Sequence, residues 1–164
     1  MKTLSKTELA IANAKTVFAN RIKQADRQTM AASELLIKKS TNVKLGKRVT
    51  KGKWKGFPIF TLTLEERATC PRSCAHWESC YGNNMMYAFR YQSGPALEAM
   101  LETELAELQR KHPNGFLVRL HILGDFYSVG YVAKWAKWLG QFPALHVYGY
   151  TANQPDAVDK TERA

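Results

Sequence analysis

Three cysteines, Cys70, Cys74 and Cys80, lie within eleven residues and are the only cysteines in the chain. Thiolates gathered in this way after an apolar segment are typical ligands of zinc and of iron–sulfur clusters. Three thiols leave one over if disulfides form, and they are one ligand short of a closed metal site. The fourth position is therefore either filled by another residue or left open for a ligand.

Two histidines are candidates for the fourth ligand of a zinc site. His76 lies between the second and third cysteines, and His121 lies in a later apolar segment. Zinc accepts three cysteines and one histidine in a closed tetrahedron. A cluster held by three cysteines instead keeps one iron open to a ligand. The residue types leave an iron–sulfur cluster, zinc and a metal-free loop as alternatives.

Apolar patterns predict the elements that position these residues. Apolar runs predict strands at residues 57–64, 116–123 and 145–151. Between them, one helix opens at Ser93-Gly-Pro95, and another runs from Ser128 to about Leu139. The resulting order of strand, helix, strand, helix, strand predicts an α/β fold with a parallel sheet of two βαβ units.

Functional groups in such sheets gather at the carboxyl ends of the strands. The cysteine loop, Gly124-Asp125 and Tyr150-Thr151 each follow one predicted strand, so we expect them to converge at one edge of the sheet. Arg119 and His121 alternate with apolar residues in the second strand, which places them on one face of the sheet.

The positive charge of the chain is concentrated before residue 57. Residues 1–56 hold 14 Lys/Arg and 3 Asp/Glu, whereas residues 57–164 hold 10 and 11. We therefore divide the chain into a basic helical N-terminal arm, residues 1–56, and an α/β domain, residues 57–164. A basic segment on a near-neutral body predicts DNA or RNA as the partner of the arm, with a solubilising role as the alternative.

Two helices and one exposed strand or hairpin are predicted for the arm. Ser5 and Glu8 form a capping box, and apolar residues at helical spacing predict a helix from there to about Asp26. A second helix is expected to start near Thr29. Residues 43–55 alternate lysine with apolar or small residues, as in an exposed strand or hairpin. The candidate nucleic-acid contacts lie in this segment: Lys44, Lys47, Arg48, Lys51, Lys53, Trp54 and Lys55, of which Trp54 either stacks on a base or anchors the arm.

The composition is that of a globular protein, with 45% apolar and 23% charged residues. No apolar run reaches the roughly 20 residues of a membrane helix, and the N-terminus lacks the apolar core of a signal peptide. We therefore expect a cytoplasmic protein without membrane contact, in which clustered cysteines stay reduced.

Several motifs together resemble the phage gene product 88 family, a family with three cysteines. The resemblance covers about residues 43–151. It rests on the following motifs: Thr69-Cys70-Pro71, Cys80-Tyr81-Gly82, Gly124-Asp125-Phe126-Tyr127-Ser128, Tyr131, Trp135 and Tyr150-Thr151.

The layout also resembles the N-terminal part of radical SAM enzymes, which place three cysteines after the first strand of a TIM-like barrel. This resemblance implies a partial barrel in which the three cysteines hold a [4Fe–4S] cluster. The open iron of such a cluster binds the amino and carboxylate groups of S-adenosylmethionine. The resemblance further implies that Asp125, with Gly124, meets the amino group and that Tyr81 is the aromatic neighbour of the last cysteine. Arg119 would meet the carboxylate or a substrate anion.

Two functions follow from these expectations. The first is an iron–sulfur protein of phage or mobile-element origin that binds S-adenosylmethionine and acts on nucleic acid in the host-cell cytoplasm. The second is a non-enzymatic nucleic-acid-binding accessory protein, in which zinc held by the cysteines and His76 or His121 stabilises the loop. Whether the chain is an enzyme depends on which of the two holds.

Overall fold

A four-stranded sheet lies at the centre of the computed structural model, which describes residues 4–26, 28, 30 and 34–154. Strands β3 (Ile59–Thr61), β5 (Phe116–Leu120) and β6 (Leu145–Gly149) run parallel in that spatial order. Strand β2 (Lys38–Lys39) pairs antiparallel with β3. The predicted α/β class and parallel strands are confirmed, whereas the described strands form an open sheet and no closed barrel.

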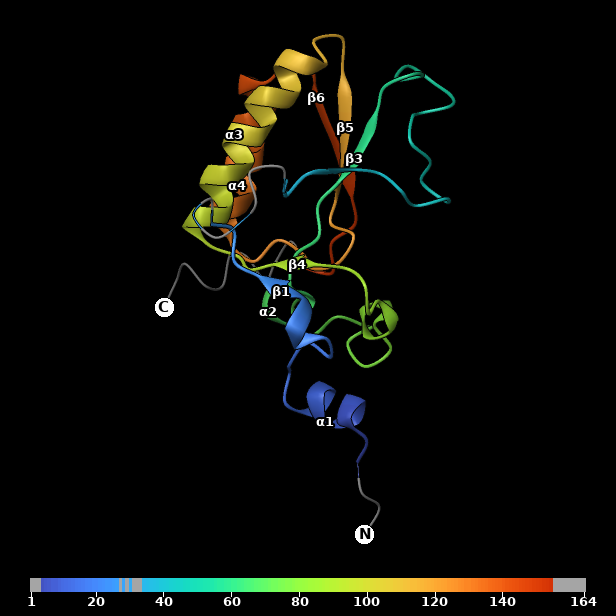
Figure 1. Cartoon of the computed structure of the whole chain (residues 1–164), viewed down its shortest axis with the longest axis vertical. Coiled ribbons are helices and arrows are strands. Elements are labelled where there is room, and N and C mark those ends of the chain that lie inside the picture. Colours follow the sequence, from blue (N-terminus) through green and yellow to red (C-terminus); the bar gives the residue numbers. More distant parts are fainter. Residues whose placement is uncertain (1–3, 27, 29, 31–33, 155–164) are drawn as a thin grey trace.

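Helices α3 (Pro95–Lys111) and α4 (Val129–Gln141) cover one face of the sheet (Figure 1). Each helix connects two parallel strands, as expected for βαβ units. Ser128 caps α4 by accepting a hydrogen bond from the backbone N–H of Tyr131 at 3.1 Å. The interface between helices and sheet forms the main core, to which these residues contribute: Phe60, Leu97, Leu101, Leu105, Phe116, Val118, Leu120, Tyr131, Trp135 and Trp138.

A loop of residues 42–57 covers part of the opposite face of the sheet (Figure 1). The ring of Trp54 stacks on His146 of β6, with 5.0 Å between the ring centroids, and Phe57 stacks on the same ring. The segment is built mainly of turns and contains no regular strand, but its two ends pair antiparallel through the bridge between Arg48 and Pro58 and through backbone hydrogen bonds of Val49 with Phe57 and Gly56. The hairpin alternative is thus present in a short, irregular form, and the regular exposed strand is wrong. Trp54 packs on the body, which is the anchoring alternative.

The N-terminal helix is much shorter than the apolar spacing predicts. Helix α1 spans Lys6–Ala12, and its predicted capping box between Ser5 and Glu8 is present. The helix ends because Asn13 donates a side-chain hydrogen bond back to the carbonyl of Leu9 and Ala14 turns to a φ of 52°. The predicted continuation to Asp26 is therefore wrong. The chain forms instead a 3-10 turn, η1 (Ala19–Arg21), and strand β1 (Ile22–Lys23).

Pairing with the rest of the chain explains why the N-terminal third departs from local helix preference. Strand β1 pairs parallel with β4 (Arg90–Tyr91) in a second, two-stranded sheet. Thr29 lies outside the described residues, and the described part of the second predicted helix is not helical. Leu36 and Ile37 are buried there, and both backbone N–H groups donate to the buried carboxylate of Glu104 at 2.9 Å.

None of the helices in the described part of the chain is both long and apolar enough to span a membrane.

Candidate metal and ligand site

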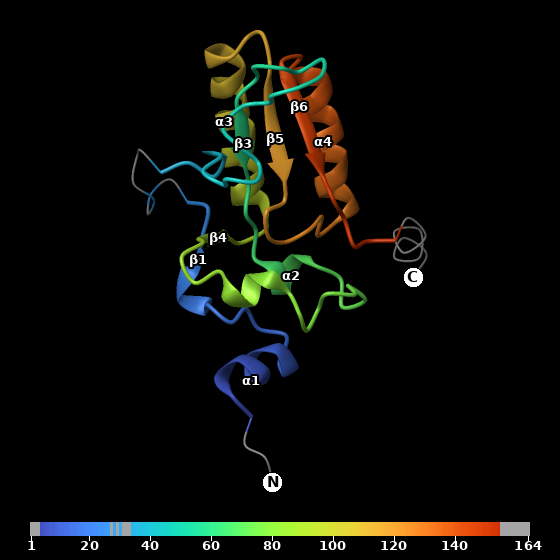
Figure 2. The same ribbon diagram turned by 90° about the vertical axis from the view of Figure 1, so that its right-hand side faces the viewer.

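One cavity of about 640 Å³ lies at the carboxyl ends of the parallel strands. All three cysteines line it, together with Gly124 and Asp125 after β5 and Tyr150 and Thr151 after β6. Figure 2 shows β5 and β6 pointing toward the part of the chain that carries helix α2 (Glu66–Thr69) and the cysteine loop. The structure thus brings together the three groups that the sequence places at one edge of the sheet.

The cysteines enter the cavity as free, half-buried thiols. Burial raises the pKa of the Cys70 thiol to about 12, and negative charge on Asp125, Cys74, Cys80 and Glu66 adds to this effect. A bound metal cation opposes it by stabilising the thiolates. Among the described residues, no group of three or more His, Cys, Asp or Glu side chains is placed to hold a single metal ion.

Asp125 connects the ends of two strands as well as lining the cavity. Its side chain is buried, and its two carboxylate oxygens accept hydrogen bonds from the backbone N–H groups of Phe126 and Ala152, each at 2.7 Å. Its own backbone N–H donates to Thr69 Oγ1 of α2 at 3.1 Å. A carboxylate held in this way has a structural role that the sequence pattern did not reveal, in addition to any contact with a ligand.

Gly124 is required by the packing of the same turn. Its φ is +84°, and a Cβ added there would lie 2.6 Å from Thr69 Oγ1 and 2.7 Å from the Cβ of Leu64. This close approach between the end of β5 and the chain around α2 accounts for a glycine at this position.

The substitution Gly124→Ala should lower the free energy of unfolding by about 2 kcal/mol or more, because it combines backbone strain with overpacking. Gly52→Ala is the matched control, since Gly52 has a φ of +77° but no atom within 4 Å of an added Cβ. The control should lose only about 1 kcal/mol of backbone strain. Chemical denaturation of both variants measures the difference, and equal losses would show that the close packing is unimportant.

The cysteine loop is held by a buried arginine of α2. Arg67 donates to the backbone carbonyl of Trp77, within the loop, and to Asn83 Oδ1 at 2.9 Å. Its guanidinium also lies over the Trp77 ring, 4.6 Å from the centroid. Asn83 in turn donates to the carbonyl of Glu78 at 2.9 Å. This network fixes an otherwise irregular loop and thereby positions the thiols.

A second buried arginine holds the turn that follows the last cysteine. Arg90 is fully buried and pairs with Glu66 of α2, with 2.9 Å between Nε and Oε2. It also donates to the carbonyl oxygens of Gly82, Met85 and Ala88 at 2.8, 3.2 and 2.7 Å. These bonds shape the 3-10 turn η2 (Tyr81–Asn84) and the chain leading to β4.

Two residues that line the cavity each have one buried side-chain atom without a partner among the described residues: Oε1 of Glu66 and Nδ1 of His121. Buried polar atoms are normally hydrogen-bonded, so an unpartnered one in a cavity-lining residue is unusual. His121 is kept neutral, because burial and the nearby Arg119 lower its pKa to about 3. A neutral imidazole is the form that binds metals.

Arg119 and His121 do not share a face of the strand as predicted. Strand β5 ends at Leu120, so the alternation does not extend to His121, whose ring packs on Tyr131 of α4. Nε2 of His121 lies 3.3 Å from the Tyr131 hydroxyl. Arg119 is on the opposite face, between the rings of Tyr148 and Tyr150, and donates to the carbonyl of Leu120. Both residues nevertheless line the cavity.

Apart from the half-buried Trp54, the remaining predicted site residues are exposed. His76 and Tyr81 lie at the surface of the cysteine loop and line the cavity, and burial raises the pKa of the Tyr81 hydroxyl. The predicted nucleic-acid contacts lie in the loop of residues 42–57, away from the cavity. Their basic members are exposed: Lys44, Lys47, Arg48, Lys51, Lys53 and Lys55.

Glu66, Arg67 and Arg90 are the residues of this site that sequence reasoning missed. Each is charged and buried, whereas charged residues are expected at the surface unless a partner is known. The only signal in the sequence is their position: Glu66 and Arg67 lie shortly before the cysteine loop, and Arg90 lies after it.

The comparison with protein families gives one match: the family described as gene product 88 matches residues 35–162. No curated protein and no solved structure matches the chain. The matched range begins before residue 57 and includes β2, the loop of residues 42–57 and every side chain of the cavity described above.

Proposed function

The chain belongs to the gene product 88 family, and for this phage protein we propose that Cys70, Cys74 and Cys80 hold a [4Fe–4S] cluster and that the adjoining cavity binds S-adenosylmethionine. The observation that carries the proposal is the set of residues that line one cavity. Three free thiols and Arg119 line it together with Glu66 and His121, each of which has one buried polar atom without a partner among the described residues.

The described side chains do not form a ready-made site for a single metal ion. A zinc ion draws its ligands to about 2.0–2.3 Å and therefore needs them close together. The described residues offer no such group of three, although the thiols share one cavity. A cluster of several atoms holds its cysteine ligands further apart than one ion does, so the lack of a compact group of three among the described residues is compatible with a cluster.

The residues of the cavity divide into groups with different roles toward the ligand. When bound, the cluster supplies an electron and an open iron for the reductive cleavage of S-adenosylmethionine. Arg119 pairs with a carboxylate, and Asp125 and Gly124 border the place of the amino group. Tyr81 and Tyr150 provide aromatic surfaces at the edge of the cavity. We expect this chemistry in the host-cell cytoplasm, where the thiols stay reduced.

An accessory protein with structural zinc is the second candidate. The observation that favours it is His121, which lines the cysteine cavity and whose neutral ring has an Nδ1 without a partner among the described residues. His76, exposed in the loop, is the other candidate ligand. In this case the exposed cations of residues 42–57 contact DNA or RNA without catalysis. Anaerobic purification followed by iron, sulfide and zinc analysis separates the two. Brown protein with iron and sulfide supports the cluster, and colourless protein with one zinc per chain supports the alternative.

The substitution Arg119→Gln tests S-adenosylmethionine binding by the reconstituted protein. It should leave the iron content unchanged and weaken S-adenosylmethionine about tenfold, or about 1.4 kcal/mol, because a charge-assisted contact with the carboxylate is lost. Arg119→Lys is the control that keeps the charge and should recover part of the affinity. Calorimetric titration gives the affinities, and equal binding by wild type and Arg119→Gln would remove Arg119 from the site.

Asp125→Asn is a less direct probe, because both carboxylate oxygens accept backbone N–H bonds. An amide offers one acceptor oxygen and one donor nitrogen, so one of these bonds is lost. The variant should therefore lose stability as well as affinity.

A further inference from the structure

A second cavity, of about 430 Å³, lies on the same face of the sheet as Arg119. Thr61 of β3 lines this second cavity and is in register with Arg119 of β5, so the two side chains lie on one face. Ile122 borders both cavities, which makes them neighbours. We call the second cavity the aromatic groove and define it by these residues: Lys38, Lys39, Thr61, Thr63, Tyr87 and Phe89.

The aromatic groove is positively charged. The Nζ atoms of Lys23 and Lys38 lie 4.1 and 5.6 Å from the centroid of the Phe89 ring, and the Arg21 guanidinium lies 5.4 Å from it. Glu34 pairs with Lys23 at 2.7 Å and approaches Lys38 to 3.9 Å. The described residues that line the groove include Lys38 and Lys39 and no Asp or Glu. The chemistry of the groove therefore favours an anion.

Exposed aromatic rings accompany this charge. Tyr87 in the groove is 80% exposed, and Tyr150 at the neighbouring cysteine cavity is 83% exposed. Tyr81, also at the cysteine cavity, is more than half exposed. Aromatic rings beside cations in a groove form the usual surface on which unpaired bases stack, while the cations contact the phosphates.

We propose that the aromatic groove binds single-stranded nucleic acid, with a base stacked on Tyr87 and phosphates on Lys38 and Lys39. The strand continues past Ile122 toward the cysteine cavity, where Tyr150 offers a second ring. This inference rests on the proposed function in one respect: it makes the bound nucleic-acid strand the substrate of the cysteine site. Binding in the groove itself can be measured without any metal.

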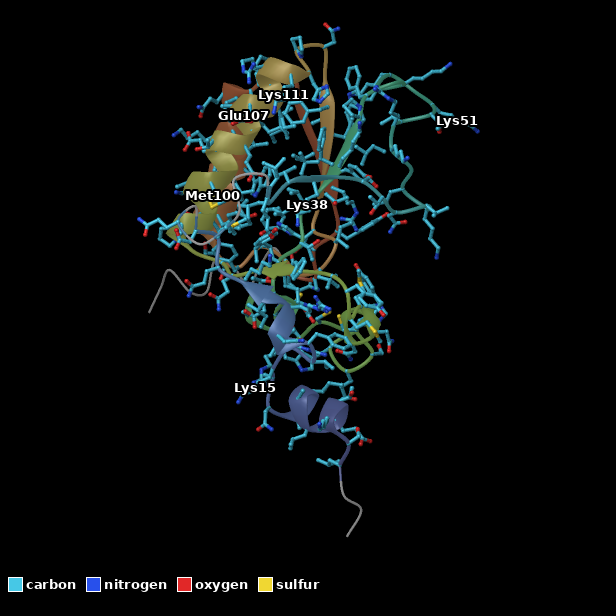
Figure 3. All side chains as sticks on the ribbon, in the orientation of Figure 1. Lys15, Lys38, Lys51, Met100, Glu107 and Lys111 are labelled. Carbon is cyan, nitrogen blue, oxygen red and sulfur yellow. The ribbon has the colours of Figure 1, made fainter. Side chains whose placement is uncertain are left out.

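The groove differs from the loop of residues 42–57, the surface that the sequence marks for nucleic acid. Figure 3 shows Lys51 at the outer end of that loop, apart from Lys38 beside the sheet. Loop lysines attract any polyanion, double-stranded or single-stranded, through charge alone. Stacking on Tyr87 requires an unpaired base, so the groove gives a preference for single strands.

The test measures the affinity for a single-stranded oligonucleotide and for the corresponding duplex, in parallel, over a range of salt concentrations. Tyr87→Ala should weaken single-strand binding about fivefold or more and leave duplex binding unchanged. Tyr87→Phe keeps the ring and should bind like wild type. Because Tyr87 is exposed, neither substitution removes a buried contact.

The lysines are tested by two matched double variants. Lys38→Gln with Lys39→Gln should reduce the salt dependence of single-strand binding by about 1.4 in the log–log slope, since each phosphate contact on a single strand contributes about 0.7. Lys51→Gln with Lys55→Gln removes the same charge from the loop and should weaken single-strand and duplex binding alike.

The proposal is overturned if wild type binds no single-stranded nucleic acid, if it prefers the duplex, or if Tyr87→Ala binds like wild type. Iron and sulfide analysis of the same preparations distinguishes this failure from that of the proposed function. If the wild-type protein contains no iron and Tyr87→Ala still weakens single-strand binding, the groove proposal stands and the cluster is refuted.

Discussion

Alanine in place of Cys70, Cys74 or Cys80 should remove most of the iron and sulfide that the wild-type protein holds after anaerobic reconstitution. The three thiols line one cavity and are the only cysteines of the chain, so a lost ligand has no replacement thiol. Ligands of a metal centre act as a unit, and a cluster held by two cysteines is exchangeable. Iron and sulfide per chain, with the absorbance of the cluster, measure the effect.

Ser79→Ala is the matched control for these variants. Ser79 lines the same cavity next to Cys80 and is exposed, so its substitution changes the loop by one hydroxyl and removes no proposed ligand. It should keep the full iron content. Cysteine variants with the iron content of this control would refute the cluster, and variants that lose zinc instead would establish the alternative site.

The three parallel strands and the two long helices between residues 57 and 151 could be predicted from the sequence because they carry strong local patterns, whereas the short elements α2, η2 and β4 in the same range are not predicted. The leucine stripe of α3, the Ser128 cap of α4 and the apolar runs of β3, β5 and β6 each agree with the tertiary fold. Convergence of the cysteine loop with Gly124-Asp125 then follows from parallel strands alone.

The N-terminal third could not be predicted in the same way because tertiary pairing overrides its local pattern. Residues at helical spacing from Ser5 to Asp26 indicate one long helix, yet Ile22 and Lys23 pair with β4. The charge pattern likewise suggests a separate arm, while β2 pairs with β3 and Glu104 binds the backbone of Leu36 and Ile37. Deleting residues 1–56 would therefore remove part of the core, so point substitutions are the sound test of nucleic-acid binding.

The buried charged residues that hold the site in place also could not be predicted from sequence patterns. Nothing in the spacing of Glu66 and Arg90 shows that they form a buried pair across 24 residues. Asp125 illustrates the same limit. Its position after a strand indicates a contact with a ligand, but it does not indicate that the carboxylate accepts hydrogen bonds from two backbone N–H groups.

The substitution Arg90→Ala should destabilise the protein more than Gly124→Ala does. Arg90 is fully buried, and its removal leaves the carboxylate of Glu66, only 1% exposed, without its cation. It also removes the donors from the carbonyl oxygens of Gly82, Met85 and Ala88. Breaking a buried ion pair on one side costs about 3–5 kcal/mol, a large part of the roughly 5–15 kcal/mol that stabilises a domain.

The melting temperature should accordingly fall by roughly 10 °C, at about 2–4 °C per kcal/mol for a chain of this size. Lys111→Ala is the control, because it breaks the exposed pair with Glu107, labelled in Figure 3, and should change stability by less than about 0.5 kcal/mol. Calorimetry of both variants makes the comparison. A melting temperature of Arg90→Ala within about 2 °C of the control would contradict the buried pair.

The double variant Glu66→Gln with Arg90→Met separates the charge from the lost hydrogen bonds. Glutamine removes the unpaired charge while keeping the size of the side chain, so the double variant should recover part of the stability lost by Arg90→Ala. The carbonyl oxygens of Gly82, Met85 and Ala88 remain without this donor in both variants, and the turn after Cys80 is therefore expected to stay loosened. Iron content should then remain low in the double variant even where stability recovers, because Arg90 fixes the position of the last cysteine. Full iron content in a restabilised double variant would show that η2 needs no such support.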